Sequence, residues 1–247
     1  MKALLAIAGF VLLEARRTRL LWLFVAAVLL ALGAGVFAGA TAITETAVVR
    51  GAIAAAALRL GSVFLLALFV TASMVRAIDD KQLDLLVAMP LPRAAILGGR
   101  ALGYSAIAVL VAAAAGIALT PLAAGPALAA WAASLACELL VVAAVALLCV
   151  LTFSQVTAAM AAVTAFYVLA RSMDALLLMA ASPLGRGDGT ADAVIGAVLR
   201  AIAAVIPPLG RFAGAGWLSQ GVPEPAMLAL LAAQAGWLAT VTVVLVG

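Results

Sequence analysis

Four ionisable residues lie inside long apolar stretches, where a charge is costly and is a functional candidate by default. They are two basic and two acidic residues: Arg59, Glu138, Arg171 and Asp174. At a helical rise of about 1.5 Å per residue, Glu138 and Arg171 fall at similar depths on consecutive antiparallel helices. Arg171 and Asp174 share one helix face. We therefore expect a neutral cluster of charges in the outer half of a helical bundle.

Two roles for this cluster stay open. Structural ion pairing that fixes the register of the helices is the interpretation we favour, and a polar lining of a substrate path is the alternative. Catalysis is poorly supported because the chain has no histidine and no recognisable nucleophile motif. Cys137 and Cys149 are about 18 Å apart on a continuous helix, which is too far for a disulfide.

The composition identifies the medium that surrounds these residues. The chain has 247 residues, of which 68% are hydrophobic and 10% are charged. Soluble domains carry about 45–50% apolar and about 25% charged residues. The fold class is therefore all-α: a single polytopic transmembrane domain over residues 1–247, with six helices of about 20 residues or more. The net charge of +4 is interpreted as a feature of membrane topology and not as a sign of nucleic-acid binding.

The apolar segments give the plan of the chain. Residues 3–18 are too few to span a membrane and predict an N-terminal helix at the cytoplasmic interface, with a retained signal-like start as the alternative. Residues 183–225 form an outer-face connection that includes a helical pattern over 194–206, and Gly33 and Gly35 predict close helix packing. The six spans are expected at 20–40, 53–75, 101–123, 128–151, 156–182 and 226–247.

The distribution of basic residues predicts the orientation. With the N-terminus in the cytoplasm, eight lysines and arginines fall in inner segments and four in outer segments. An excess of positive charge marks cytoplasmic loops. We therefore expect both termini to be cytoplasmic.

The connection over residues 76–100 is longer than a link between two spans requires. Asp79 and Asp80 are placed where a helix N-terminus favours negative charge. Leu83 and Leu86 follow at helical spacing, and Pro90 ends the pattern. This indicates a short amphipathic helix around Asp79–Met89. It is either a solvated hairpin or an element that docks on a partner.

The same segment resembles the signature of type-2 ATP-binding-cassette (ABC) exporter permeases. That signature has a leading acid, a Gly-Thr-Leu-Glu-like run, Pro-x-x-Arg and a closing Leu-Gly-Lys. Lys81-Gln82 stands where Gly-Thr is usual. The N-terminal helix, six spans and outer helix extend the resemblance over the whole chain. The matching positions are Asp79, Leu83-Asp84, Pro90, Arg93 and Arg100.

The resemblance implies a non-enzymatic transport subunit in the bacterial cytoplasmic (inner) membrane. It would pair with a second permease copy or homologue and with ABC ATPase subunits, amid membrane lipids and without nucleic acid. No cofactor is expected in this chain, which lacks a G-x-x-x-x-G-K-[ST] phosphate loop, so the partner would bind ATP and Mg. The residues implied in ATPase coupling are Asp79, Asp80, Leu83, Asp84, Leu86, Pro90 and Arg93.

Two other functions remain open at this point. The first is a haem-exporter-type subunit of cytochrome c maturation, which shares the six-span plan and a similar run from acidic residues to Pro-Leu-Pro. The second is an intramembrane enzyme or a non-transporting assembly factor. The substrate cannot be inferred from the sequence.

Overall fold

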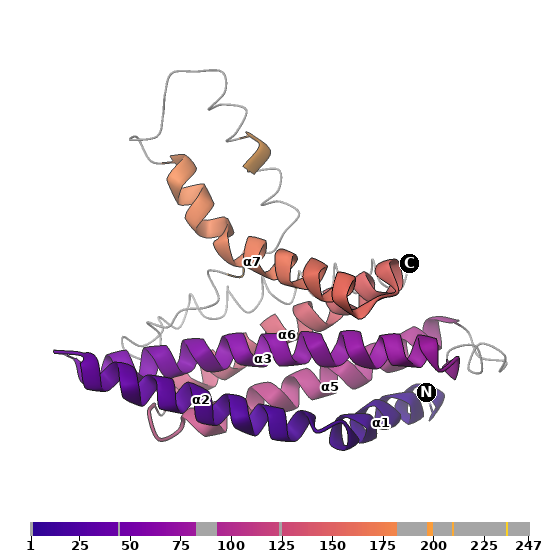
Figure 1. Ribbon diagram of the computed structural model, residues 1–247, viewed down its shortest axis with the longest axis horizontal. Coiled ribbons are helices and arrows are strands. Elements are labelled where there is room, and N and C mark those ends of the chain that lie inside the picture. Colours follow the sequence, from indigo (N-terminus) through magenta and orange to yellow (C-terminus); the bar gives the residue numbers. More distant parts are fainter. Residues whose placement is uncertain are drawn as a thin grey trace.

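The computed structural model describes residues 2–43, 45–82, 93–123 and 125–181, together with 197–199, 209 and 236. Figure 1 shows long helices in these ranges and no strand among the described residues. The helices are α1 (Lys2–Arg17), α2 (Leu20–Thr41), α3 (Thr46–Asp79), α5 (Arg93–Leu119), α6 (Pro126–Phe153) and α7 (Val156–Ala181).

Five of these helices, α2, α3, α5, α6 and α7, are long and apolar enough to cross a membrane. The chain is therefore an all-helical polytopic membrane protein, as its composition predicts. Five of the six expected spans correspond to these helices. The sixth, 226–247, lies outside the described residues except for a helical residue at 236, and of the expected outer helix only 197–199 are described, also as helix.

Helix α3 is longer than its predicted span of 53–75. It begins at Thr46 and continues to Asp79, because the helical hydrogen bonds extend beyond the apolar span into flanking segments that contain Arg50 and Arg76. Helix α5 is displaced toward the N-terminus relative to 101–123, beginning at Arg93 and ending at Leu119. Its end precedes Pro121, which has no N–H to continue the helical ladder.

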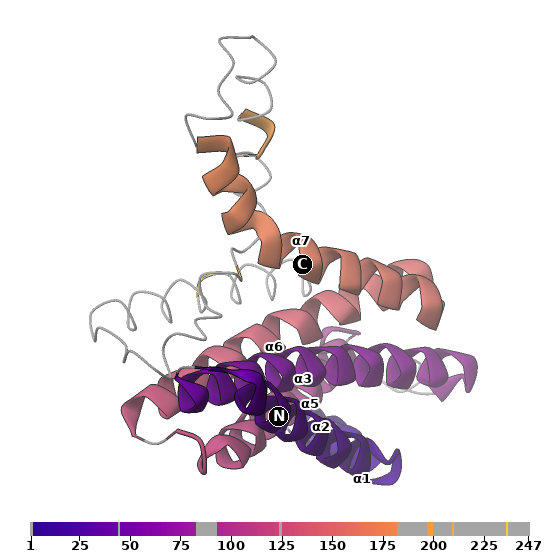
Figure 2. The same ribbon diagram turned by 60° about the vertical axis from the view of Figure 1, so that its left-hand side comes forward.

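Helix α1 packs along α5, and two glycines of α5 permit the close approach. A Cβ atom at Gly103 would lie 2.7 Å from Val11 Cβ, and one at Gly99 would lie 2.9 Å from Ile7 Cβ. Arg19 then adopts a left-handed conformation with φ 58° and turns the chain from α1 into α2. Figures 1 and 2 show α1 and α2 as separate rods joined at this turn.

Helix α2 lies against α3 through a similar contact. A Cβ atom at Gly35 would lie 2.8 Å from the Arg50 carbonyl oxygen and 2.9 Å from Ala54 Cβ. At Gly33 the predicted close packing is not found, because no atom of the described residues lies within 4 Å of the corresponding Cβ position. The two glycines are two residues apart and so point to different sides of the helix.

The core is built around α3 and α6, with α5 and α7 packed beside them. Leu58 and Val70 of α3 and Leu135 and Leu139 of α6 are fully buried. Gly125, with φ 85°, and Pro126 form the turn that starts α6, and Ser154 ends it with φ 53°. In both views α7 starts beside α6 and then diverges from the other helices (Figures 1 and 2).

The glycine contact between α1 and α5 can be tested by adding one methyl group. We expect Gly103→Ala to lower the free energy of unfolding by about 1–3 kcal/mol, because Val11 would have to move to admit the new Cβ. Gly33→Ala is the matched control, since its Cβ meets open space and alanine favours the helix. The measurement is thermal unfolding in detergent, monitored by size-exclusion chromatography. Equal midpoints for the two variants would show that the close approach is not needed.

Candidate functional site

A buried carboxylate forms the centre of the intramembrane charge cluster. Glu138 of α6 is fully enclosed, and its Oε2 accepts a hydrogen bond of 2.6 Å from Nη1 of Arg59 on α3. The Arg59 side chain is itself only 2% exposed. An ion pair removed from water in this way is favourable only if its remaining hydrogen-bonding capacity is also met.

One face of α6 supplies most of the further contacts of Arg59. The Ser134 hydroxyl lies 3.3 Å from both Nη1 and Nη2, and the Trp131 carbonyl oxygen accepts from Nη2 at 3.4 Å. The guanidinium carbon also lies 5.2 Å from the centre of the Trp131 ring, within cation–π range. Trp131, Ser134 and Glu138 are spaced three and four residues apart, so they share one helix face.

The other oxygen of Glu138 faces α7. The Tyr167 hydroxyl donates a hydrogen bond of 2.9 Å to Oε1, and Arg171 Nη1 lies 3.6 Å from the same atom. Tyr167 and Arg171 are four residues apart and lie on one face of α7. The Arg171 side chain is 30% exposed, and its Nη1 makes no hydrogen bond among the described residues. The contact with α7 is therefore the looser side of the cluster.

The structure thus brings together three of the four predicted intramembrane charges. Glu138 and Arg171 meet as their depths predict, and Arg59 joins them from α3. Asp174 belongs to α7, but its side chain lies outside the described part of the structure. The described groups comprise two arginines and one carboxylate, so the predicted neutrality rests on Asp174.

Sequence reasoning missed three members of the cluster: Trp131, Ser134 and Tyr167. A signal was present, because Ser134 precedes Glu138 by one helical turn and Tyr167 precedes Arg171 by the same interval. Each lies one turn from a charged residue on its own helix and bonds to a charge on the neighbouring helix: Ser134 accepts from Arg59 of α3, and Tyr167 donates to Glu138 of α6. Within the described residues, no group of three histidine, cysteine, aspartate or glutamate side chains could hold a metal ion.

The predicted coupling segment is only partly described. Asp79 is the last residue of α3. The Asp80 N–H donates to the Arg76 carbonyl and the Lys81 N–H to the Ile78 carbonyl, so the predicted helix around Asp79–Met89 does not begin at Asp79. The helix of the preceding span continues through this position. The backbone of Arg93 starts α5, whereas its side chain is not described. Outside the described residues lie Leu83, Asp84, Leu86 and Pro90.

Next to this segment, α1, α3 and α5 share a polar junction that sequence reasoning did not predict. The sequence predicts Arg100 at the end of the inner connection, but the residue is only 3% exposed because α5 begins two turns earlier. Its Nη1 lies 3.5 Å from Met74 Sδ, and Tyr104 donates to Ser73 Oγ at 3.1 Å. Glu14 of α1 also pairs with an α3 arginine, at 3.5 Å from Arg76.

Comparison with known proteins leaves the family unassigned. No protein-family model matches the chain, and no curated protein matches it significantly.

Removing the carboxylate charge distinguishes a structural role of the ion pair from a role in transport. We expect Glu138→Gln to lower the free energy of unfolding by about 3–5 kcal/mol, because the buried Arg59 would lose the carboxylate that now lies 2.6 Å from it. The double variant Arg59→Gln/Glu138→Gln should recover part of that loss. Glu45→Gln, an exposed change at the start of α3, is the control. An unchanged melting midpoint together with lost transport would instead support a substrate-lining role.

Proposed function

We propose that the chain is the membrane-spanning subunit of an ABC-type exporter, driven by ATP hydrolysis in separate ATPase subunits. The exporter contains a second permease copy or homologue and moves its substrate outward across a bacterial cytoplasmic membrane. The resemblance of residues 79–100 to the type-2 exporter signature is the observation that suggests the family.

The position of that segment in the fold is the observation that supports coupling. It joins the end of α3 to the start of α5, and the two helices are connected near these ends by the Tyr104–Ser73 hydrogen bond and the Arg100–Met74 contact. The Phe69 and Tyr104 rings add an edge-on contact, with centroids 6.1 Å apart. A force applied to the segment would therefore be transmitted to α3 and α5 together.

Helix α3 can carry such a force to the charge cluster. It is a continuous helix of 34 residues, and its Arg59 is held by Glu138 of α6. Arg59 and Arg76 are separated by about 26 Å along the helix axis. Motion at the segment would thus reach α6 through one rigid element and one ion pair, without any intervening loop.

The orientation proposed here puts both termini and the segment over residues 76–100 in the cytoplasm. In a chain with Cys137 and Cys149 replaced by alanine, we expect a cysteine at Lys81 to react with an impermeant reagent only in inverted vesicles. A cysteine at Glu45, at the opposite end of α3, should react only in intact cells. The reverse labelling pattern would contradict this orientation.

Coupling is tested with substitutions on the apolar side of the segment. We expect Leu83→Asp and Leu86→Asp to abolish the stimulation of ATP hydrolysis by this chain, because an apolar anchor in a partner groove carries most of the binding energy. Asp84→Asn should cause a smaller, salt-sensitive loss, as rim charges do. The measurement is ATPase activity of the complex of this chain with its proposed ATPase subunit, reconstituted in lipid vesicles.

Thr120→Asp is the matched control for these variants. It also introduces an aspartate at an exposed turn, between α5 and α6, at the end of the bundle away from the segment. Activity should be retained in this variant, and membrane insertion should be equal in all of them. Full stimulation in the Leu83→Asp/Leu86→Asp double variant would show that the segment is not the coupling element.

A further inference from the structure

Helix α1 has an apolar face that no described residue covers. Val11 and Ala15 are buried against the rest of the protein, whereas Phe10 and Leu13 are 55% and 60% exposed. Arg17 follows Leu13 by four residues, so it continues the exposed stripe. An exposed apolar stripe that ends in arginines is typical of a helix at a lipid interface.

The exposed stripe ends in an excess of positive charge. Arg16 and Arg17 are both exposed, and neither forms an ion pair within the described part of the chain. The only acid on α1, Glu14, lies 3.5 Å from Arg76 and has its charge balanced there. The two arginines are therefore available to an anion from outside the described protein.

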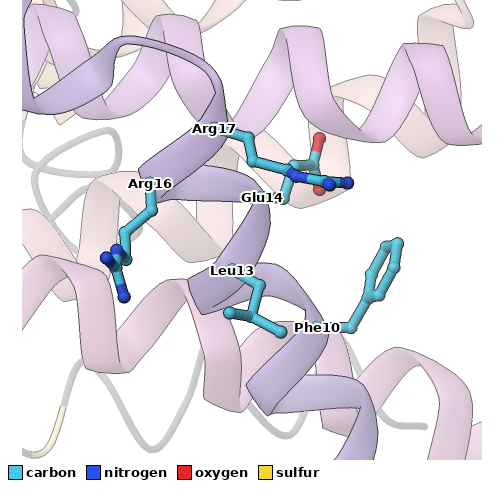
Figure 3. Close-up of a pocket in the computed structure, with 5 residues that line it drawn as sticks. All are labelled: Phe10, Leu13, Glu14, Arg16 and Arg17. Carbon is cyan, nitrogen blue, oxygen red and sulfur yellow. The ribbon is translucent and has the colours of Figure 1, made fainter.

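These side chains border a pocket of about 630 Å³ on the surface of α1. Figure 3 shows Arg17 extended beside Glu14 on the side of Phe10, while Arg16 points to the other flank of the helix. The pocket thus has an apolar part and a cationic part. Its described lining residues are Phe10, Leu13, Glu14, Arg16 and Arg17.

We propose that this pocket binds the headgroup of an acidic phospholipid. Arg17 contacts the phosphate, Arg16 adds positive potential at the same level, and an acyl chain lies along Leu13 and Phe10. Guanidinium groups match the geometry of phosphate oxygens and are well suited to this contact. The cationic part of the pocket suits a lipid phosphate, and the apolar part suits an acyl chain. A free anion or an acidic peptide would fill this pocket less completely.

The neighbouring residues place the pocket at the level of lipid headgroups. The turn at Arg19 leads directly into α2, a candidate membrane span. Trp22, in the first turn of that span, is 75% exposed. Tryptophan is enriched at the boundary between headgroups and acyl chains. The arginines therefore lie just outside the apolar layer, where lipid phosphates are found.

Binding at this pocket would stabilise the packing of α1. The helix is held to α5 at Gly99 and Gly103 and to α3 by the Glu14–Arg76 pair. A ligand that binds only the folded protein raises its stability in proportion to the logarithm of ligand concentration. The inference depends on α1 and its charges and not on the proposed transport function.

The test uses the full-length chain in a neutral detergent, titrated with phosphatidylglycerol or phosphatidylcholine. Native mass spectrometry measures the lipid-bound fraction, and thermal unfolding measures the stabilisation. We expect a preference for phosphatidylglycerol that falls about five-fold for each arginine removed, and about twenty-five-fold in Arg16→Gln/Arg17→Gln. The preference should fall less in Arg16→Lys/Arg17→Lys than in the double glutamine variant, because lysine keeps both charges but not the planar guanidinium.

Arg50→Gln is the matched control, because Arg50 is an exposed arginine at the opposite end of α3. It should leave the preference unchanged. Sodium phosphate should not compete with the lipid at millimolar concentration. Equal binding of the two lipids by the wild-type chain, or an unchanged preference in the double glutamine variant, would overturn the proposal. Displacement by sodium phosphate would also overturn it, by indicating a site for a free anion.

Discussion

The ion pair between Arg59 and Glu138 determines how the two central helices fit together. Apolar helices gain little from any one register in lipid, because the lipid chains are as apolar as their side chains. A charge left without its partner is costly at this depth. Sliding α3 past α6 by one turn, about 5.4 Å, would separate atoms that now lie 2.6 Å apart. This contact therefore selects one register among several that apolar packing alone would permit.

Close contacts at glycine residues attach α1 and α2 to the rest of the bundle. Gly35 brings α2 close to α3, and Gly99 and Gly103 bring α1 close to α5. These contacts depend on shape, whereas the Arg59–Glu138 contact depends on charge, so each restrains a different movement. The Tyr104–Ser73 hydrogen bond links α5 to α3. A continuous set of packed contacts consequently connects α1, at one end of α3, to the charge cluster farther along it.

The sequence predicted the depth of residues along their spans better than the neighbouring helix that each side chain faces. Glu138 and Arg171 could be matched because depth along a span follows from residue number. The main partner of Glu138, Arg59, could not be identified in this way, because α3 and α6 are apolar on nearly every side and periodicity does not select a face. Arg100 was misplaced for a different reason. Its charge favours a position in a connection between spans, but α5 begins at Arg93 and carries Arg100 into the bundle.

The two oxygens of Glu138 divide the cluster into a rigid half and a loose half. Oε2 binds the enclosed Arg59 at 2.6 Å, whereas Oε1 faces Tyr167 at 2.9 Å and the partly exposed Arg171 at 3.6 Å. Both groups on the Oε1 side belong to α7, which diverges from the other helices in Figure 2. A shift of α7 by a few ångströms would break the Oε1 contacts and leave the Arg59 pair intact. The carboxylate thus holds α3 and α6 in place while leaving α7 the least constrained of the helices around it.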